Sequence, residues 1–352
     1  MAEPPESPYA LAWDVGLDVG VKVWPIATAT LSAILIVGSA AGAKPAPVQM
    51  GVVLKGLDNP FFVAMYEGVR AEARRRSAHI SVRAAASSAD PRGQAALVRA
   101  LVSGRNDCYV INPIATTNLV AALRGARSPI VNVDSPIDVS AAKRAGVRVR
   151  TFIGTNDFEA GRLAAAKMVS LLGGAGTVAL VGGVADSVNS RRRLRGFEFG
   201  IRGTQVRVVA RANADYLRTQ AEVVAARFLR THPGLSGFFA VNDEMALGVA
   251  DAVDSAGKTG GVAIIGVDGI PEALDAIRGG SMNATVSQYP YVMGQMAVEA
   301  CIAAARGARL PARVDAPIAV VTPSNVARAN ATFPRPFRGY SDPFERILRK
   351  RR

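Results

Sequence analysis

From Val48 onward, short apolar runs rich in Val and Ile alternate with longer amphipathic segments. The runs are bounded by Gly, Pro, Asn and Asp. Continuous apolar runs are typical of strands buried on both faces, so the alternation predicts parallel βαβ units with helices on both sides of the sheet. The first run, QMGVVL, precedes a predicted helix from Pro60 to about Arg76. The later runs are CYVIN, PIVNV, VALVGG, GFFAV and VAIIGV.

Polar residues follow six of these runs in succession, which is more than ordinary turns require. In open α/β sheets, ligands bind beyond the carboxyl ends of the strands. Lys55 stands between a strand and a helix start, where the helix dipole disfavours a cation, so its position indicates a functional role. The residues after the other runs are Asn112, Asp134, the cluster Arg191–Arg195, Asn242 and Asp268. The sequence therefore predicts a polar, hydrogen-bonding cleft at this edge.

Each of these residues also has a purely structural interpretation. Asn59 and Asn242 each stand at a predicted helix start, where Asn is a usual cap, and for these two the capping role is favoured. Phe62 lies on the apolar face of its predicted helix and fits a core position. For Asp134 and Asp268, a role as a turn residue and a role in ligand contact are equally favoured. We expect only one arginine of the cluster to matter, with the others on a solvated face.

Composition and motif spacing argue against several other classes of protein. The 352 residues are 49% hydrophobic, enough for two domains. The net charge is +14, but the basic residues are scattered, so we interpret them as exposed helix faces and expect no nucleic acid partner. The glycines of GGAGTVALVGG precede a strand instead of following it, unlike a dinucleotide loop. With no catalytic triad or metal cluster around His79 or His232, we expect no enzyme activity, cofactor or metal.

The N-terminal residues 1–43 are interpreted as an extension with an export signal. The stretch from Val23 to Ala43 is uncharged and ends in small residues, with AGA fitting a cleavage site before Lys44. Retention as a membrane anchor is the alternative, because the stretch is almost long enough to span a bilayer. The preceding residues are acidic, and a translation start near Val19 or Val21 would remove most of them.

Cys108 and Cys301 are the only cysteines and lie far apart in sequence. Cys108 belongs to an apolar strand pattern and Cys301 to an alanine-rich helix pattern, so both are expected to be buried. Two buried thiols are the favoured interpretation, with a disulfide as the alternative.

Five blocks of the chain, at appropriate separations, carry a family resemblance: NPFFVAMYEG, VINPIATTNLV, NDEMALGVADAV, GKTGGVAIIGVDGIPEAL and ATVSQYP. From about Val48 to Asn330 the chain resembles the periplasmic sugar-binding proteins of ABC importers, in the ribose-, allose- and galactose-binding group and nearest to the allose branch. The resemblance implies a type I periplasmic binding protein fold, an α/β fold of two doubly wound parallel-sheet lobes joined by a three-segment hinge. The implied divisions are 48–153 with 289–315 for the first lobe and 154–288 with 316–330 for the second. Residues 331–352 lie beyond the resemblance, and their mix of Pro, Arg and aromatic residues indicates a basic, disordered tail whose end would touch anionic lipid.

The resemblance also implies a site between the lobes for a monosaccharide or polyol. Carboxylates would accept hydrogen bonds from sugar hydroxyls, Lys55 and Arg193 would donate, and aromatic rings would cover the C–H face. Arg193 is chosen from its neighbours by counting back from Gly196. The implied ligand residues are Lys55, Asn59, Phe61, Phe62, Asn112 and Asp134 from the first lobe, and Arg193, Tyr216, Asn242, Asp268 and Gln288 from the second lobe and a hinge.

The same resemblance implies a monomer in the periplasm or cell envelope that works with the membrane permease of an ABC importer. Lys55 and Val267 depart from the ribose branch, so ribose itself is disfavoured, whereas allose, another hexose, a pentose or a linear polyol fits. A binding protein for a chemoreceptor or sensor kinase would use the same cleft. A LacI-type regulator is disfavoured, because an apolar segment stands where its helix-turn-helix would be.

Overall fold

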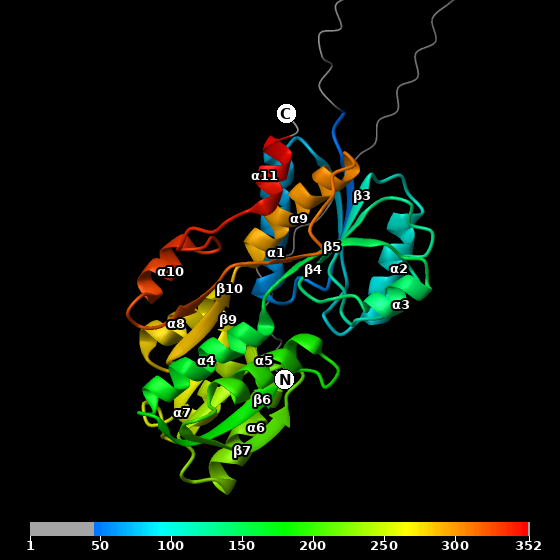
Figure 1. Ribbon diagram of the computed structural model, residues 1–352. Coiled ribbons are helices and arrows are strands. Elements are labelled where there is room, and N and C mark those ends of the chain that lie inside the picture. Colours follow the sequence, from blue (N-terminus) through cyan, green and yellow to red (C-terminus); the bar gives the residue numbers. More distant parts are fainter. Residues whose placement is uncertain (1–45, 351–352) are drawn as a thin grey trace, which may run out of the picture. The chain divides into compact units, whose positions relative to one another are not determined.

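The computed structural model describes residues 46–350, so the predicted export segment and translation start lie outside the described residues. Two six-stranded sheets organise the chain, in the orders β11-β5-β4-β3-β1-β2 and β12-β10-β9-β8-β6-β7 (Figure 1). The first contains β1 (Gln49–Leu54), β2 (His79–Ala84), β3 (Cys108–Ile111), β4 (Ile130–Val133), β5 (Val149–Gly154) and β11 (Arg313–Asp315). The second contains β6 (Ala175–Gly182), β7 (Gln205–Asn213), β8 (Gly237–Ala240), β9 (Ala263–Asp268), β10 (Ala284–Gln288) and β12 (Ile318–Val321). The predicted two-lobe α/β fold is confirmed.

Helices connect the strands and cover the sheets. Those of the first lobe are α1 (Pro60–Arg75), α2 (Pro91–Val102), α3 (Val139–Arg144) and α9 (Pro290–Ala305). Those of the second are α4 (Asp157–Leu171), α5 (Val188–Gly200), α6 (Arg218–Thr231), α7 (Asp243–Ser255) and α8 (Pro271–Gly279), and α10 (Val326–Thr332) and α11 (Pro343–Arg349) follow β12. Within residues 46–350, no helix has the length and apolarity needed to cross a membrane.

The chain passes between the two sheets after β5, after β10 and between β11 and β12. All strand pairs are parallel except that of β10 with β12, which returns to the second sheet in the opposite direction. The carboxyl ends of the parallel strands therefore gather near the crossings. A hydrogen bond of 3.2 Å from Asn189 Nδ2 to the backbone oxygen of Asp134 joins the two lobes there. The fold thus presents the strand ends of both sheets to one cleft.

The C-terminal tail is ordered up to residue 350, so the prediction of a disordered tail is wrong for this part of the chain. After α10, which packs on α8, the chain reaches α11 on the other lobe, where α11 packs against α9 (Figure 1). Phe344 is fully buried and Leu348 nearly so. Asp342 caps α11 by accepting hydrogen bonds from the backbone N–H groups of Phe344 and Glu345. Composition alone does not reveal that these apolar side chains are covered by a distant helix.

Cys108 and Cys301 form a disulfide, so the interpretation as two free thiols is wrong. The two residues lie 193 positions apart, with their Cα atoms at 5.6 Å. Cys108 belongs to β3 and Cys301 to α9, and both are fully buried. The pairing exists because α9 returns to pack on the first sheet, a contact between distant segments that cysteine spacing does not encode.

Candidate functional site

An ion pair lies at the carboxyl edge of the first sheet. Lys55, just after β1, places its Nζ 3.1 Å from Asp134 Oδ2, just after β4. The same Nζ donates to Ser135 Oγ at 2.5 Å and lies 5.4 Å from the centre of the Phe62 ring. Asp134 has a φ of 60°, a left-handed conformation that is uncommon for a residue with a side chain. Such backbone exceptions cluster at functional sites.

Asn112 follows β3, the strand between β1 and β4, and its side chain is fully buried. Its backbone oxygen accepts a 2.8 Å hydrogen bond from Gln94 Nε2, which holds the loop in place. Its amide group has no comparable partner: Nδ2 makes only a weak 3.7 Å contact with Met65 Sδ, and Oδ1 accepts no bond from residues 46–350. A buried polar group without a partner costs about 1–3 kcal/mol, so this amide lowers the stability of the ligand-free protein.

Two other predicted ligand residues act as helix caps, as the capping interpretation predicts. Asn59 Oδ1 accepts from the N–H of Phe61 at 2.8 Å, and Asn242 Oδ1 accepts from the N–H of Met245 at 3.1 Å. Asn59 is half-buried and Asn242 is buried at the end of β8. Phe61 and Phe62 pack edge to face with ring centres 5.2 Å apart. Both residues are buried.

Arg193 is the buried arginine of its cluster, whereas the other three are exposed. It comes from α5, and its Nε donates to Asp157 Oδ1 at 2.8 Å while Nη1 donates to the backbone oxygen of Val241 at 2.7 Å. Nη1 also lies 3.6 Å from Asp268 Oδ1. Two carboxylates therefore fix the guanidinium, so that its charge is already compensated within the second lobe.

Asp268 and Gln288 end the neighbouring strands β9 and β10. Gln288 Nε2 donates to Asp268 Oδ1 at 2.5 Å, and Gln288 Oε1 accepts from Thr155 Oγ1. This chain of hydrogen bonds links two of the crossings between the lobes. Burial raises the pKa of Asp268 well above its ordinary value; Arg193 opposes this shift and the nearby Asp243 adds to it. Ionised Asp268 therefore needs further hydrogen-bond donors.

Tyr216 follows β7 in a left-handed conformation, with a φ of 65°. Its ring lies against Gly183, where a Cβ atom would approach the ring to 2.3 Å, so only glycine allows this packing. The hydroxyl lies 2.5 Å from Ser187 Oγ. Burial raises the pKa of Tyr216 to about 12, so the hydroxyl keeps its proton at neutral pH.

Several cleft residues were missed by reasoning from the sequence. Ser135 follows Asp134 directly and has no motif of its own. Asp157, at the start of α4, has the pattern of a helix cap and gives no sign that it pairs with Arg193. Nothing in the sequence marks Thr155 or Asn189. With Asp157 included, two cations face three buried carboxylates in the cleft.

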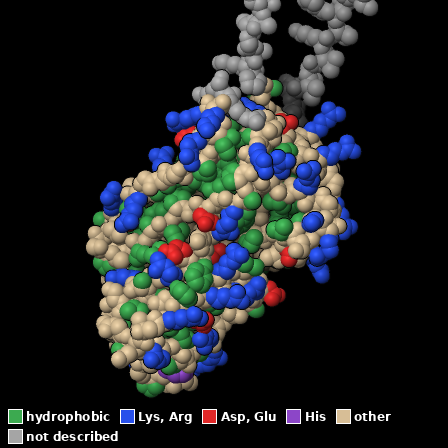
Figure 2. Space-filling view, viewed as in Figure 1, with side chains coloured by type: hydrophobic (Ala, Val, Ile, Leu, Met, Phe, Trp, Pro, Cys, Tyr) green, Lys and Arg blue, Asp and Glu red, His purple; other side chains and the backbone are tan. Residues whose placement is uncertain are grey.

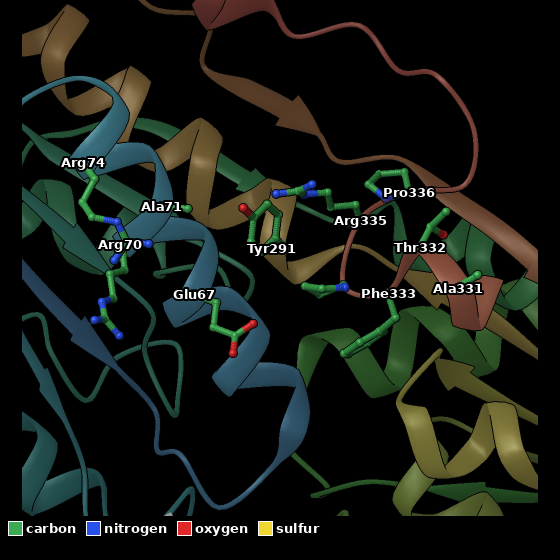
Figure 3. Close-up of a pocket in the computed structure, with 11 residues that line it drawn as sticks. Glu67, Arg70, Ala71, Arg74, Tyr291, Ala331, Thr332, Phe333, Arg335 and Pro336 are labelled. Carbon is green, nitrogen blue, oxygen red and sulfur yellow. The ribbon is translucent and has the colours of Figure 1, made fainter. Parts of the chain in front are cut away.

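A separate surface groove lies outside this cleft. Glu67, Arg70 and Arg74 of α1 line one side, and the segment 331–336 lines the other (Figure 3). The guanidinium of Arg335 lies 5.7 Å from the centre of the Tyr291 ring. Arg70 and Arg74 lie together on α1, and Tyr291 lies between them and Arg335, so the three charges do not converge on one ligand (Figure 3). The groove contains none of the predicted ligand residues.

The described part of the chain, 46–350, contains no group of His, Cys, Asp and Glu that could hold a metal ion. His79 begins β2 and His232 ends α6. Both therefore lie at the edge of their sheet opposite the strand ends that form the cleft. The chemistry of the cleft is hydrogen bonding by carboxylates, amides and compensated cations.

Residues 50–309 match the family model described as "Periplasmic binding protein domain". The chain is 33% identical over 270 residues to the D-allose-binding periplasmic protein of Escherichia coli (strain K12), covering 75% of this chain and 87% of that protein. It is 31% identical over 276 residues to the ribose import binding protein of Bacillus subtilis (strain 168), covering 78% and 87%.

A similar solved structure is that of an ABC transporter periplasmic solute binding protein from Actinobacillus succinogenes 130z with bound D-allose. The two superpose with a TM-score of 0.76 at 26% identity, over 80% of this chain and 99% of that one. The family match, the sequence identities and the superposed fold agree with one another. The chain belongs to the periplasmic binding protein domain family.

Proposed function

We propose that this protein captures a monosaccharide or polyol between its two lobes and delivers it to the permease of an ABC importer. Its relatives include proteins named for binding D-allose and for importing ribose, and a similar structure holds D-allose. The family consists of binding proteins, and the protein is not an enzyme. The inferred ligand is neutral, because Lys55 and Arg193 are both already paired with carboxylates.

The observation that carries this proposal is a group of buried acceptors in the cleft: one amide oxygen without a partner and two carboxylates that can accept further hydrogen bonds. Asn112 Oδ1 accepts no bond from the described residues, and Asp134 and Asp268 are nearly buried. Sugar hydroxyls donate hydrogen bonds without carrying charge, so they satisfy these acceptors and leave the charge balance unchanged. Bonds to ionised groups are roughly twice as strong as neutral ones, which makes the carboxylates the main anchors.

The proposed ligand residues are the same eleven that the family resemblance implies. Lys55, Asn112 and Asp134 present polar atoms from the first lobe. Arg193 and Asp268 do so from the second. The remaining members are Asn59, Phe61, Phe62, Tyr216, Asn242 and Gln288. The proposed lobes are 48–153 with 289–315 and 154–288 with 316–330, closing about the three crossings.

Export through the N-terminal segment is part of the same proposal. Its relatives include a protein named as periplasmic. The disulfide between Cys108 and Cys301 supports export, because such bonds persist in oxidising compartments and are rare in the cytosol.

The test is a thermal-shift panel of the chain from Lys44 with D-allose, D-ribose, D-fucose and myo-inositol. A ligand at 100 times its dissociation constant adds about 2.7 kcal/mol of stability, which raises the melting temperature visibly. A sugar acid such as D-glucuronate serves as the charged control, for which we expect no shift. Failure of every neutral sugar and polyol would contradict the proposal.

A further inference from the structure

The edge of the first sheet opposite the cleft is unusually basic. In a parallel sheet, every helix ends and every strand begins at this edge. Three segments that lead into neighbouring strands β4, β5 and β11 read RGARSP (124–129), KRAGVR (143–148) and RGARLP (306–311). Each carries two or three basic residues and no acid, and all of these side chains are exposed. The exposed Arg105 precedes β3, although that segment also carries Asp107.

The second sheet lacks this concentration of charge at its equivalent edge. Its segments read GIRGTQ (200–205), RTHPGLS (230–236), AGKTGGV (256–262) and RGGSMN (278–283), with one Lys or Arg each. Arg278 is also paired with Asp275 at 2.8 Å. By contrast, Arg124, Arg127 and Arg144 form no ion pair with any residue of the described chain. The excess positive charge is therefore concentrated on one lobe.

The C-terminal helix adds to the same edge. α11 packs on α9, and Glu345 lies close enough to Arg75 and Arg76, at the end of α1, for their charges to lower its pKa, although its hydrogen bond to Arg349 contributes most. The exposed side of α11 carries Arg346 and Arg349, and the exposed Lys350 follows the end of this helix. On the face that Figure 2 shows, Lys and Arg side chains lie at the upper end of the molecule, where Figure 1 places α11.

We propose that this basic edge, formed by the segments 124–129, 143–148 and 306–311 with Arg105 and the end of α11, docks on an anionic phospholipid bilayer. Phosphate headgroups attract clusters of Lys and Arg within about a Debye length of the surface. The edge faces away from the cleft, so docking leaves the cleft open to solvent. The docked protein must also leave the bilayer surface again, because it has to deliver its ligand to a membrane permease.

Chain connectivity favours a bilayer over other polyanions. β1 begins at the basic edge, and in the sequence only residues 44–47 separate Val48 from the apolar stretch that ends at Ala43. So short a connection spans at most about 18 Å. Before any cleavage, while that stretch is in a membrane, the basic edge is thus the part of the folded protein held beside the headgroups.

The proposal is tested by sedimentation with lipid vesicles. The probe protein is the chain from Lys44 to Arg352, because residues 46–352 form a compact unit distinct from residues 1–45. We expect it to sediment with vesicles that mix phosphatidylcholine and phosphatidylglycerol. It should not sediment with phosphatidylcholine alone, nor with the mixed vesicles at ~1 M salt, where the Debye length falls to about 3 Å.

Two triple variants with the same change in net charge separate the edge from overall charge. The first is Arg124→Gln, Arg127→Gln and Arg144→Gln. Each basic residue near an anionic surface contributes about fivefold in partitioning, so this variant should bind on the order of 100-fold more weakly. The replaced side chains are exposed, so its thermal unfolding should match that of the wild type.

The matched control is Arg202→Gln, Arg230→Gln and Arg278→Gln on the second lobe, which should bind like the wild type. Equal weakening of both variants would show that overall charge acts instead of the edge and would overturn the proposal. Failure of the wild type to bind phosphatidylglycerol vesicles would do the same. The proposal would also be overturned if a DNA duplex displaced the protein from vesicles and the first triple variant bound that duplex as tightly as the wild type.

Discussion

Replacement of Asn112 by leucine should make the ligand-free protein more stable and its ligand binding weaker. The Asn112 side chain is fully buried, its Oδ1 accepts no bond from the described residues, and its Nδ2 only touches Met65 Sδ at 3.7 Å. A buried amide whose oxygen has no hydrogen-bond partner lowers the stability of the ligand-free protein. Its presence is explained if it binds a ligand.

The size of both effects follows from the burial of this amide. A buried acceptor without a partner costs about 1–3 kcal/mol, so Asn112→Leu should raise the free energy of unfolding of the ligand-free protein by about 1 kcal/mol or more. In the complex, the same change leaves a sugar hydroxyl unpaired. A loss of about 1–3 kcal/mol in binding corresponds to an affinity lower by about 5- to 150-fold.

The assay combines urea unfolding without ligand with calorimetric titration of the sugar that gives the largest shift in the panel. Thr151→Val is the matched control, because Thr151 Oγ1 is also buried without a partner but lies within β5, away from the strand ends. The control should gain stability with unchanged affinity. If Asn112→Leu instead lowers ligand-free stability by more than about 1 kcal/mol and leaves affinity intact, the amide is structural and the reasoning is refuted.

Three further predictions concern stability. Replacing Cys108 and Cys301 together by alanine should lower the free energy of unfolding by up to about 5 kcal/mol, the chain-entropy value for a loop of 193 residues, without changing ligand affinity; coincident urea midpoints would contradict this. Phe344→Ala should cost about 3–5 kcal/mol in urea unfolding because the ring is fully buried, and a loss below about 0.5 kcal/mol would mean that the tail is not docked. Burial, with Asp342 adding, raises the pKa of Glu299 to about 9 in the folded state, although Arg76 pairs with this carboxyl and opposes the shift. The contribution of Glu299 to stability is therefore complete below 4.5 and is lost as pH rises to about 9. In the Glu299→Gln variant, the free energy of unfolding should fall less steeply between pH 4.5 and about 9. An unchanged slope would contradict the raised pKa of Glu299.

The fold could be predicted from the sequence because the patterns that specify its strands and helices lie in adjacent residues. Apolar runs and helix starts such as Asn59 and Asn242 are written in adjacent residues, and the structure places both asparagines at caps. Lys55 and Asp134 were both predicted from their strand ends. Their mutual contact of 3.1 Å follows once β1, β3 and β4 lie side by side. The choice of Arg193 among its neighbours agrees with its burial.

The remaining features depend on contacts between distant segments. The disulfide requires α9 to return to the first sheet, and the ordered tail requires α11 to find α9. Arg193 pairs with Asp157 from a helix 36 positions earlier, although Asp157 has only the pattern of a helix start. The concentration of charge on one sheet edge is also invisible along the chain, because its segments are spread between residues 105 and 350 and meet only in the folded sheet.

Calorimetric titration of Asp134→Ala and Asp268→Ala with the sugar identified in the panel tests the proposed cleft most directly. Each carboxylate is expected to accept charge-assisted hydrogen bonds worth about 1.5–3 kcal/mol apiece, so either change should weaken binding on the order of 100-fold or more. Arg335→Ala in the separate groove serves as control and should bind like the wild type. Loss of binding in both aspartate variants, with their folds intact by circular dichroism, is the predicted result; retained affinity in both would place the ligand elsewhere.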